Sequence, residues 1–180
     1  MENAYDIIRL DPADFSKCGN IWDTERRPDL AERFLRELLC GDRITYVCQI
    51  NGEYVGEVSL VFEMEDPEYT IPGRRIYVSR LLVKRAYRRQ GIGKRLTAFA
   101  IGAAEAMGYW EQSIGVDLDN YSALRLYTEA GFRTILFLGE DAGGKYAKLL
   151  RRSTASGGQE GAGAREGTHG ERENNVENRI

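Results

Sequence analysis

Glycines and basic residues gather in one short segment near the middle of the chain, RRQGIGKR (88–95). Gly91 and Gly93 lack a Cβ, so the backbone can fold closely there and expose successive N–H groups. If a helix begins at this point, its unpaired amides and its dipole favour an anion. Six cations lie within twelve residues of a chain with net charge −3: Lys84, Arg85, Arg88, Arg89, Lys94 and Arg95. The segment therefore indicates a site for a phosphate group.

Other phosphate motifs fit this segment less well. A dinucleotide fingerprint needs a third glycine where Leu96 stands, and a Walker A loop needs Ser or Thr where Arg95 stands. A glycine turn beside a solvated basic helix face explains the pattern equally well when the segment is taken alone. Nucleic-acid binding through the cations is a further alternative, but the net acidity of the chain disfavours it.

A second segment, NYSALRLYTEAGF (120–132), begins 27 residues after Gly93. In this order and spacing, the two segments resemble the GNAT acetyltransferase superfamily. In that family R/Q-x-x-G-x-G/A binds the CoA pyrophosphate, and N-x-x-A-x-x-L-Y-x-x-x-G-F marks the helix after the next strand. The matching residues are Arg88, Gly91 and Gly93, then Asn120, Ala123, Leu126, Tyr127, Gly131 and Phe132. The resemblance covers roughly residues 5–152 and implies a mixed α/β fold with a mostly antiparallel central sheet flanked by helices.

The resemblance also implies which residues bind acetyl-CoA as the acyl donor. Backbone groups of Leu81, Leu82 and Val83 at the end of a strand would bond the pantetheine amides. Arg88 belongs to the pyrophosphate motif, whose backbone amides would come from Arg89, Gln90, Gly91, Ile92, Gly93 and Lys94. Asn120 would contact the CoA arm, cap the following helix, or do both.

Tyr127 is the residue that the resemblance marks for catalysis. A phenol with a pKa near 10 is protonated at neutral pH and can donate to a departing thiolate. Packing beneath the cofactor is its alternative role. Some relatives carry a glutamate base on the strand before the glycine loop, but Ile76–Arg80 contains no carboxylate. Glu57, Asp117, a water chain or no dedicated base remain open.

The acceptor would be an amine, with a small molecule favoured over a protein or peptide. EMEDPEY (63–69) holds four carboxylates, which would favour a polycation if they lined the acceptor cleft and would otherwise be a solvated loop. The resemblance implies direct transfer in a ternary complex without a metal. A CoA-binding regulatory module without turnover is the alternative outside the enzymes.

The elements that must position these residues follow from hydrophobic spacing. Strands are expected at 5–10, 44–50, 53–63, 74–83 and 110–118, with two closing strands after Gly131. Helices are expected at 28–39, after Gly91 as far as Gly108, and at 120–130, with a weaker helical turn at 13–18. Asn51-Gly52 predicts a tight hairpin. On the return strand, Tyr54, Val58, Leu60 and Phe62 are expected to share one face.

Composition excludes several other classes of protein. Three cysteines without C-x-x-C spacing indicate neither a disulfide framework nor a zinc site, and the lone histidine, His169, lies outside the predicted body. We expect one domain at 1–152 and a disordered polar tail at 153–180. No apolar run is long enough to span a bilayer, and the chain is expected in the cytoplasm without membrane or nucleic-acid partners. The sequence leaves the oligomeric state open, with a homodimer as one option.

Overall fold

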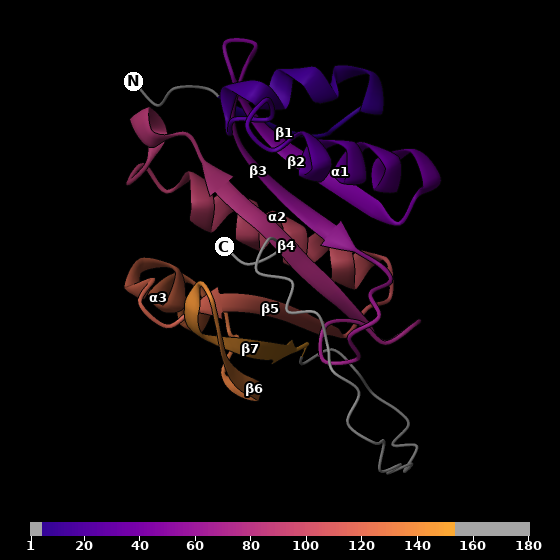
Figure 1. Cartoon of the computed structure of the whole chain (residues 1–180), viewed down its shortest axis with the longest axis vertical. Helices are drawn as coiled ribbons and strands as arrows, with labels where there is room; N and C mark the ends of the chain where they lie inside the picture. The colour runs from indigo at the N-terminus through magenta and orange to yellow at the C-terminus, as the bar shows by residue number, and fades with distance from the viewer. Residues whose placement is uncertain (1–4, 154–180) are drawn as a thin grey trace.

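The computed structural model describes residues 5–153, which form a seven-stranded sheet flanked by helices (Figure 1). The elements follow in the order β1 (Tyr5–Arg9), η1 (Pro12–Asn20), α1 (Pro28–Cys40), β2 (Arg43–Ile50), β3 (Glu53–Val61), β4 (Arg75–Val83), η2 (Arg85–Tyr87), α2 (Ile92–Ala106), β5 (Glu111–Asp117), α3 (Tyr121–Glu129), β6 (Thr134–Asp141) and β7 (Gly144–Arg152). The short helices η1 and η2 are 3₁₀ helices. Apart from η2, which was not predicted, this order of strands and helices is the predicted one.

The strands lie in the order β1-β2-β3-β4-β5-β7-β6. Every neighbouring pair is antiparallel except β4 and β5, which run parallel. The predicted mixed α/β fold with a mostly antiparallel sheet is thus confirmed.

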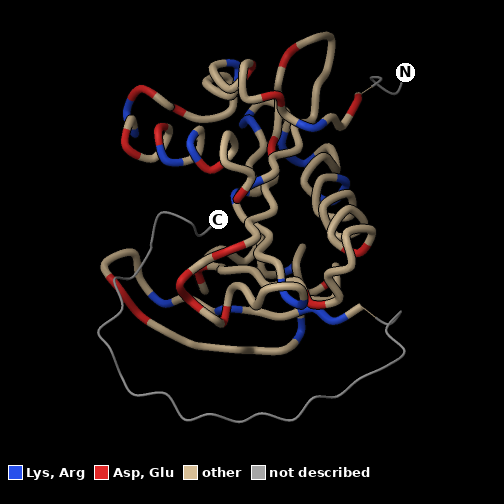
Figure 2. The backbone as a smooth tube through the Cα atoms, turned by 90° about the vertical axis from the view of Figure 1, so that its right-hand side faces the viewer, with Lys and Arg blue, Asp and Glu red and all other residues tan. Residues whose placement is uncertain are grey.

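Helices cover both faces of the sheet. Figure 2 views the strands from the side, with the charge-rich helix α1 on one side of them and α2 on the other. The main core holds residues of α2 and α3 together with Val58, Leu60 and Val116 of the sheet. A smaller cluster beneath η1 holds Leu10 and Val47 of the sheet's opposite face. We call this opposite face, which α1 and η1 cover, the α1 face.

Local sequence sets the ends of the helices. Pro28 opens α1, where its missing N–H costs nothing, and Gly41 with φ +89° ends it. Gly91 with φ +81° precedes α2, and Gly108 with φ +89° follows it. The helix stop predicted at Gly108 is where the chain turns.

The hairpin between β2 and β3 has its predicted turn, because Asn51 and Gly52 both have positive φ angles. The predicted face of Tyr54, in contrast, is wrong. The register between β2 and β3 shifts between Cys48 and Gln49, so the two-residue alternation is broken there. Tyr54 therefore packs with Leu10 beneath η1, on the face opposite Val58 and Leu60.

No helix among residues 5–153 is long and apolar enough to cross a bilayer. In the same part of the chain, no three His, Cys, Asp or Glu side chains form a group that could hold a metal ion.

Candidate functional site

The neighbouring strands β4 and β5 pair over only three residues. The parallel register joins Arg75, Ile76 and Tyr77 to Glu111, Gln112 and Ser113, and it ends there. Beyond this point the two strands diverge, as Figure 1 shows. The other edge of β4 stays paired with β3 as far as Val83. From Val78 to Val83, the edge of β4 that faces away from β3 is therefore open to a ligand with amide groups.

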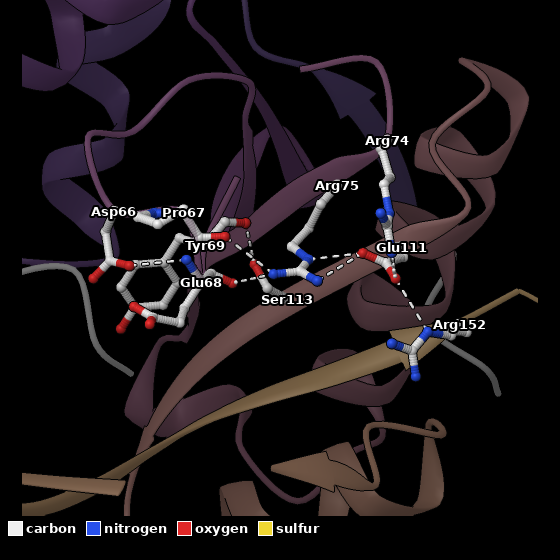
Figure 3. Close-up of polar contacts among 9 residues, drawn as sticks. All are labelled: Asp66, Pro67, Glu68, Tyr69, Arg74, Arg75, Glu111, Ser113 and Arg152. Carbon is white, nitrogen blue, oxygen red and sulfur yellow. Dashed lines mark hydrogen bonds and ion pairs between the residues drawn. The ribbon is translucent and has the colours of Figure 1, made fainter. Parts of the chain in front are cut away.

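An ion cluster fixes the strands together at the closed end of this opening. Glu111 is fully buried, and its Oε1 accepts from Arg74 at 3.0 Å and from Arg152 at 3.1 Å. Its Oε2 accepts from Arg75 Nε at 2.9 Å (Figure 3). Arg75 also donates to the carbonyl oxygens of Pro67 and Glu68, at 3.0 and 3.2 Å. One carboxylate thus joins the start of β4, the start of β5 and the end of β7.

A β-bulge lies in β4 where the strands have separated. Glu57 and Ser59 are two residues apart on β3. Their partners on β4, Leu82 and Ser79, are three residues apart, so β4 has one extra residue. The extra residue is accommodated at Arg80, whose φ is +57°, an uncommon conformation for a residue other than glycine. Bulges bend a strand and redirect its side chains, so this one directs Arg80 toward the α1 face.

The glycine loop continues directly from this open edge. Gly91 adopts the left-handed conformation before α2, and the first amide that bonds within the helix is that of Arg95, to the Gly91 carbonyl at 3.1 Å. The amides of Ile92, Gly93 and Lys94 belong to the first turn, which has no acceptors inside a helix. The structure therefore places three of the six predicted amides, those of Ile92, Gly93 and Lys94, in the first turn of α2, while their contact with phosphate stays a prediction.

The side chains of two residues in the predicted pyrophosphate motif hold the loop in its conformation. Arg88 Nε donates to the carbonyl of Val83 at 2.9 Å, and the Gln90 side-chain amide donates to the carbonyl of Ala86 at 3.2 Å. The first bond ties the loop to the last residue of β4. Arg88 therefore supports the loop through its side chain, while a phosphate contact of Arg88 or Arg89 stays a prediction.

Glu53 holds the start of the loop, a role that sequence reasoning missed. Its carboxylate pairs with Lys84 and accepts from the Tyr87 hydroxyl at 3.0 Å. Glu53 follows the hairpin turn and lies 31 and 34 residues before these partners, so no local motif signals the contact. Arg95 stacks on the Tyr5 ring, with its guanidinium carbon 4.3 Å from the ring centroid. Several loop cations are thus engaged within the domain, which weakens the nucleic-acid alternative.

Gly93 lies where the predicted cofactor segments meet. A Cβ built there would approach Leu126 of α3 at 3.8 Å and Val83 of β4 at 3.9 Å, both ordinary contacts. Packing alone therefore admits alanine at this position. At Gly91 the positive φ is what requires glycine, because nothing lies within 4 Å of a Cβ built there.

Tyr127 is completely buried in the main core, with its ring edge-to-face against Phe132 at 5.9 Å. Its hydroxyl has no hydrogen-bond partner within residues 5–153. Burial, with a smaller effect from Tyr77, raises the pKa of Tyr127 above its ordinary value, so the phenol keeps its proton. A buried hydroxyl without a partner is uncommon and is consistent with an acceptor that a ligand supplies.

Asn120 caps α3. Its side-chain oxygen accepts from the amide of Ala123 at 3.2 Å and from the Ser122 hydroxyl at 3.1 Å. The capping role is therefore present, and the contact with the CoA arm stays a prediction.

Polar side chains form a buried layer on the α1 face of β2, β3 and β4. Thr45 and Ser59 share a hydrogen bond of 2.8 Å, and Ser79 stands opposite Ser59. Glu57 lies in the same layer, 3.7 Å from Arg80. Burial raises the pKa of Glu57 above its ordinary value, although the charges of Arg80 and Arg43 act in the opposite direction.

The two carboxylates that the sequence left open as bases differ in position. Glu57 stands directly across from Leu82 of the open edge, whereas Asp117 stands opposite Tyr146 in the pairing of β5 with β7. The acidic segment 63–69 is partly neutralised, since Lys148 of β7 pairs with both Asp66 and Glu68. These pairs favour a structural role for the segment over the binding of a polycation.

Comparison with known proteins places the chain in a family. Residues 4–132 match the acetyltransferase (GNAT) family, and because the match spans most of the chain, the chain belongs to that family. N-acetyltransferase family 8 member 3 of Rattus norvegicus is 30% identical over 88 residues. These residues are 49% of this chain and 37% of that protein, so the chain spans well under half the length of this relative.

Solved structures share the fold at low sequence identity. The PaiA N-acetyltransferase of Thermoplasma acidophilum, solved in complex with coenzyme A, superposes with a TM-score of 0.61 at 17% identity, over 83% of this chain and 99% of that one. The ribosomal-protein-S18-alanine N-acetyltransferase of Escherichia coli gives a TM-score of 0.66 at 15% identity, over 86% and 97%. At such identities the likeness establishes the fold alone.

Proposed function

We propose that this protein is an N-acetyltransferase that moves the acetyl group of acetyl-CoA directly onto an amine. The early end of pairing between β4 and β5 is the observation that carries the proposal, because it leaves a backbone edge open beside a glycine-started helix. When bound, acetyl-CoA supplies a thioester carbon for an amine to attack and a sulfur as the leaving atom. The backbone of Leu81, Leu82 and Val83 would hold the pantetheine arm.

The remaining predicted cofactor residues have roles that their positions support. Backbone amides of 89–94 would hold the pyrophosphate at the positive end of the α2 dipole. Asn120 would contact the CoA arm from the start of α3.

Tyr127 is the proton donor in this proposal. Because burial raises its pKa, the phenol is protonated when the reaction begins. It would donate a hydrogen bond to the sulfur that strengthens as charge develops there, and would pass on its proton as the C–S bond breaks. The neutral acceptor nitrogen loses one proton to solvent as the new N–C bond forms and the C–S bond breaks, and Tyr127 regains one from solvent, so the products are the amide and the CoA thiol. Direct transfer of this kind uses no acyl-enzyme and no metal.

The acceptor is proposed to be a small amine rather than a protein. The fold does not decide this point, since a neighbour of the same fold is named for an alanine of a ribosomal protein. A cytoplasmic location and a homodimer stay predictions.

Titration calorimetry of acetyl-CoA with the full chain tests the cofactor site. Gly91→Ala is expected to weaken acetyl-CoA binding about tenfold or more, ~1.4 kcal/mol. The added Cβ makes the positive φ strained, and the backbone amides at the start of α2 would shift. Gly108→Ala is the matched control, since both glycines flank α2 with positive φ and open space around a Cβ. Both variants should lose about 1–2 kcal/mol of stability, but only Gly91→Ala should lose affinity.

Turnover is measured next, as free CoA thiol released with a panel of amines. If the two glycine variants lose affinity for acetyl-CoA equally, or if neither loses it, the proposed cofactor site is contradicted. Tight binding without turnover on any amine would instead identify a regulatory CoA-binding module.

A further inference from the structure

Two buried arginines approach the same aromatic ring on the α1 face. The guanidinium carbon of Arg43, from β2, lies 4.0 Å from the centroid of the Phe34 ring, and that of Arg80, from the β4 bulge, lies 5.3 Å from it. Arg43 is 2% exposed, and the side chain of Arg80 is 11% exposed. Guanidinium groups are rarely buried this deeply unless acceptors surround them.

The surrounding residues satisfy these guanidinium groups only in part. Arg43 Nε donates to Glu37 at 2.7 Å, but within residues 5–153 its Nη1 has no hydrogen-bond partner. Arg80 Nη2 lies 3.7 Å from Glu57, beyond hydrogen-bond length, and both Nε and Nη2 of Arg80 lack partners in the same range. The hydroxyl of Ser79, the residue before Arg80, is also buried without a described partner. Four buried donor atoms on the α1 face therefore have no acceptor among the described residues.

Each arginine faces one carboxylate, Glu37 at Arg43 and Glu57 at Arg80. Burial lowers the pKa of Arg80; the charge of Glu57 opposes this effect, and repulsion from Arg43 and Arg27 adds to it. Burial raises the pKa of Glu57, against the charges of Arg80 and Arg43. An anion that brings further acceptor oxygens would stabilise the two buried guanidinium groups.

Arg80 adjoins the strand edge that is proposed to hold pantetheine. Arg80 directly precedes Leu81, the first residue of the open edge proposed for pantetheine. The Trp22 ring covers Arg80, with the guanidinium carbon 4.5 Å from the ring centroid. Trp22 is partly exposed and, together with residues 16, 19–21 and 23–25, lines an open hollow. Trp22 therefore contacts the Arg80 guanidinium and also lines this solvent-facing hollow.

We infer that the acceptor is an amine that also carries a carboxylate, and that Arg43, Ser79 and Arg80 bind this carboxylate. A guanidinium fork matches the two oxygens of a carboxylate, and the Ser79 hydroxyl would add one more donor. The inference rests on the proposed transfer reaction and names its substrate class. It disfavours polycationic acceptors, because Arg43 and Arg80 would repel them.

Matched acceptors test the inference in the full-length protein. A pool of common amino acids is compared with the pool of their carboxamides, which lack the carboxylate. Because losing this charge also lowers the pKa of the amine, kcat/KM is followed as released CoA thiol and is expressed per neutral amine. The acids are expected to be preferred at least about tenfold, as charge-assisted hydrogen bonds imply. In Arg80→Lys, which keeps the charge but loses the fork, this ratio is expected to fall about tenfold.

Arg75→Lys is the matched control. Arg75 is also a buried arginine of β4, but Glu111 and two carbonyl oxygens satisfy it. This variant should lose stability while keeping the preference for acids. A wild-type ratio of one or less, or a preference that survives Arg80→Lys, would overturn the inference.

A binding measurement separates this inference from the proposed transfer. N-acetylated amino acids carry the carboxylate but offer no amine, and they are expected to raise the melting temperature of the wild type more than their carboxamides do. Arg80→Lys should lose this difference. If the N-acetylated acids raise the melting temperature more than their carboxamides but no amine is turned over, the anion site stands and the proposed transferase is rejected. If amine carboxamides are turned over but amino acids are not, the transferase stands and the anion site is rejected. Equal melting temperatures with both ligand pools would count against the anion site.

Discussion

At the scale of single residues, Tyr127 joins two properties that normally exclude each other. Its side chain is completely buried, yet its hydroxyl has no described partner. An unsatisfied buried hydroxyl costs about 1–3 kcal/mol. A residue that serves only packing would gain stability as phenylalanine, so the retained hydroxyl points to function.

Tyr127→Phe is therefore expected to slow the enzyme and stabilise the fold together. We expect kcat to fall about a hundredfold, the lower end for general acids, because a thiolate leaves tolerably without a proton. The free energy of unfolding should rise by about 1 kcal/mol. Thiol-release kinetics and urea denaturation measure the two effects.

Tyr54→Phe is the control for this variant. Tyr54 is also buried, but its hydroxyl donates to Asp14 at 3.5 Å beneath η1. Its loss should lower stability slightly and leave kcat unchanged. A Tyr127→Phe variant with full activity would leave Tyr127 a packing residue.

At the scale of elements, the opening between β4 and β5 depends on how firmly their paired ends are held. Glu111 supplies that hold, with three arginines from two segments, the start of β4 and the end of β7, around one buried carboxylate. Burial alone would raise the pKa of Glu111. The hydrogen bonds and charges of Arg74, Arg75 and Arg152 outweigh it, so the pKa lies below its ordinary value.

Glu111→Gln is expected to destabilise the domain by about 3 kcal/mol at pH 7, because Arg75 would keep a buried charge without its anion. A lowered carboxylate pKa contributes stability above its unfolded value near 4.5, and this contribution is lost as the pH falls through the folded value. The difference between variant and wild type should therefore shrink below about pH 4.5. Urea denaturation from pH 7 to pH 3 measures it.

Glu129→Gln is the control, because Glu129 makes an exposed pair with Arg125 one turn away on α3. Such pairs contribute little, so this variant should stay close to the wild type at every pH. A Glu111→Gln penalty that is independent of pH would contradict the electrostatic explanation.

The elements were predictable where local residues decide them. Asn51-Gly52 gave the hairpin, and Asn120 and Gly91 stand at helix starts because their backbone or side-chain chemistry suits those positions. The face of Tyr54 was not predictable, because a bulge breaks the strand alternation without a local signal. The bulge at Arg80 has no sequence signal either, since arginine has no preference for positive φ.

At the scale of the whole molecule, the described core and both proposed sites lie within residues 5–153. Strand β7 ends at Arg152, and the amide of the next residue, Ser153, donates to the Trp110 carbonyl at 2.8 Å. The polar segment predicted as a disordered tail otherwise lies outside the described residues.

A chain that ends after Ser153 is expected to melt within about 2 °C of the full chain, since a change well under 1 kcal/mol moves the midpoint little. Its affinity for acetyl-CoA should also be unchanged. Differential scanning calorimetry and the acetyl-CoA titration check both. A clear loss of either would show that residues 154–180 contribute to the domain, against the predicted boundary.

The sequence by itself determined the order of strands and helices, the glycine start of α2, and the family resemblance carried by Arg88, Gly91, Gly93 and Asn120–Phe132. These features depend on residues close together in the chain, where backbone freedom, capping and hydrophobic spacing act. Only the tertiary structure decided where β4 leaves β5, how Glu53 and Glu111 hold the two ends of β4, and that Arg43 and Arg80 meet beside Phe34. These features depend on register and burial between segments far apart in the chain, which no local pattern encodes.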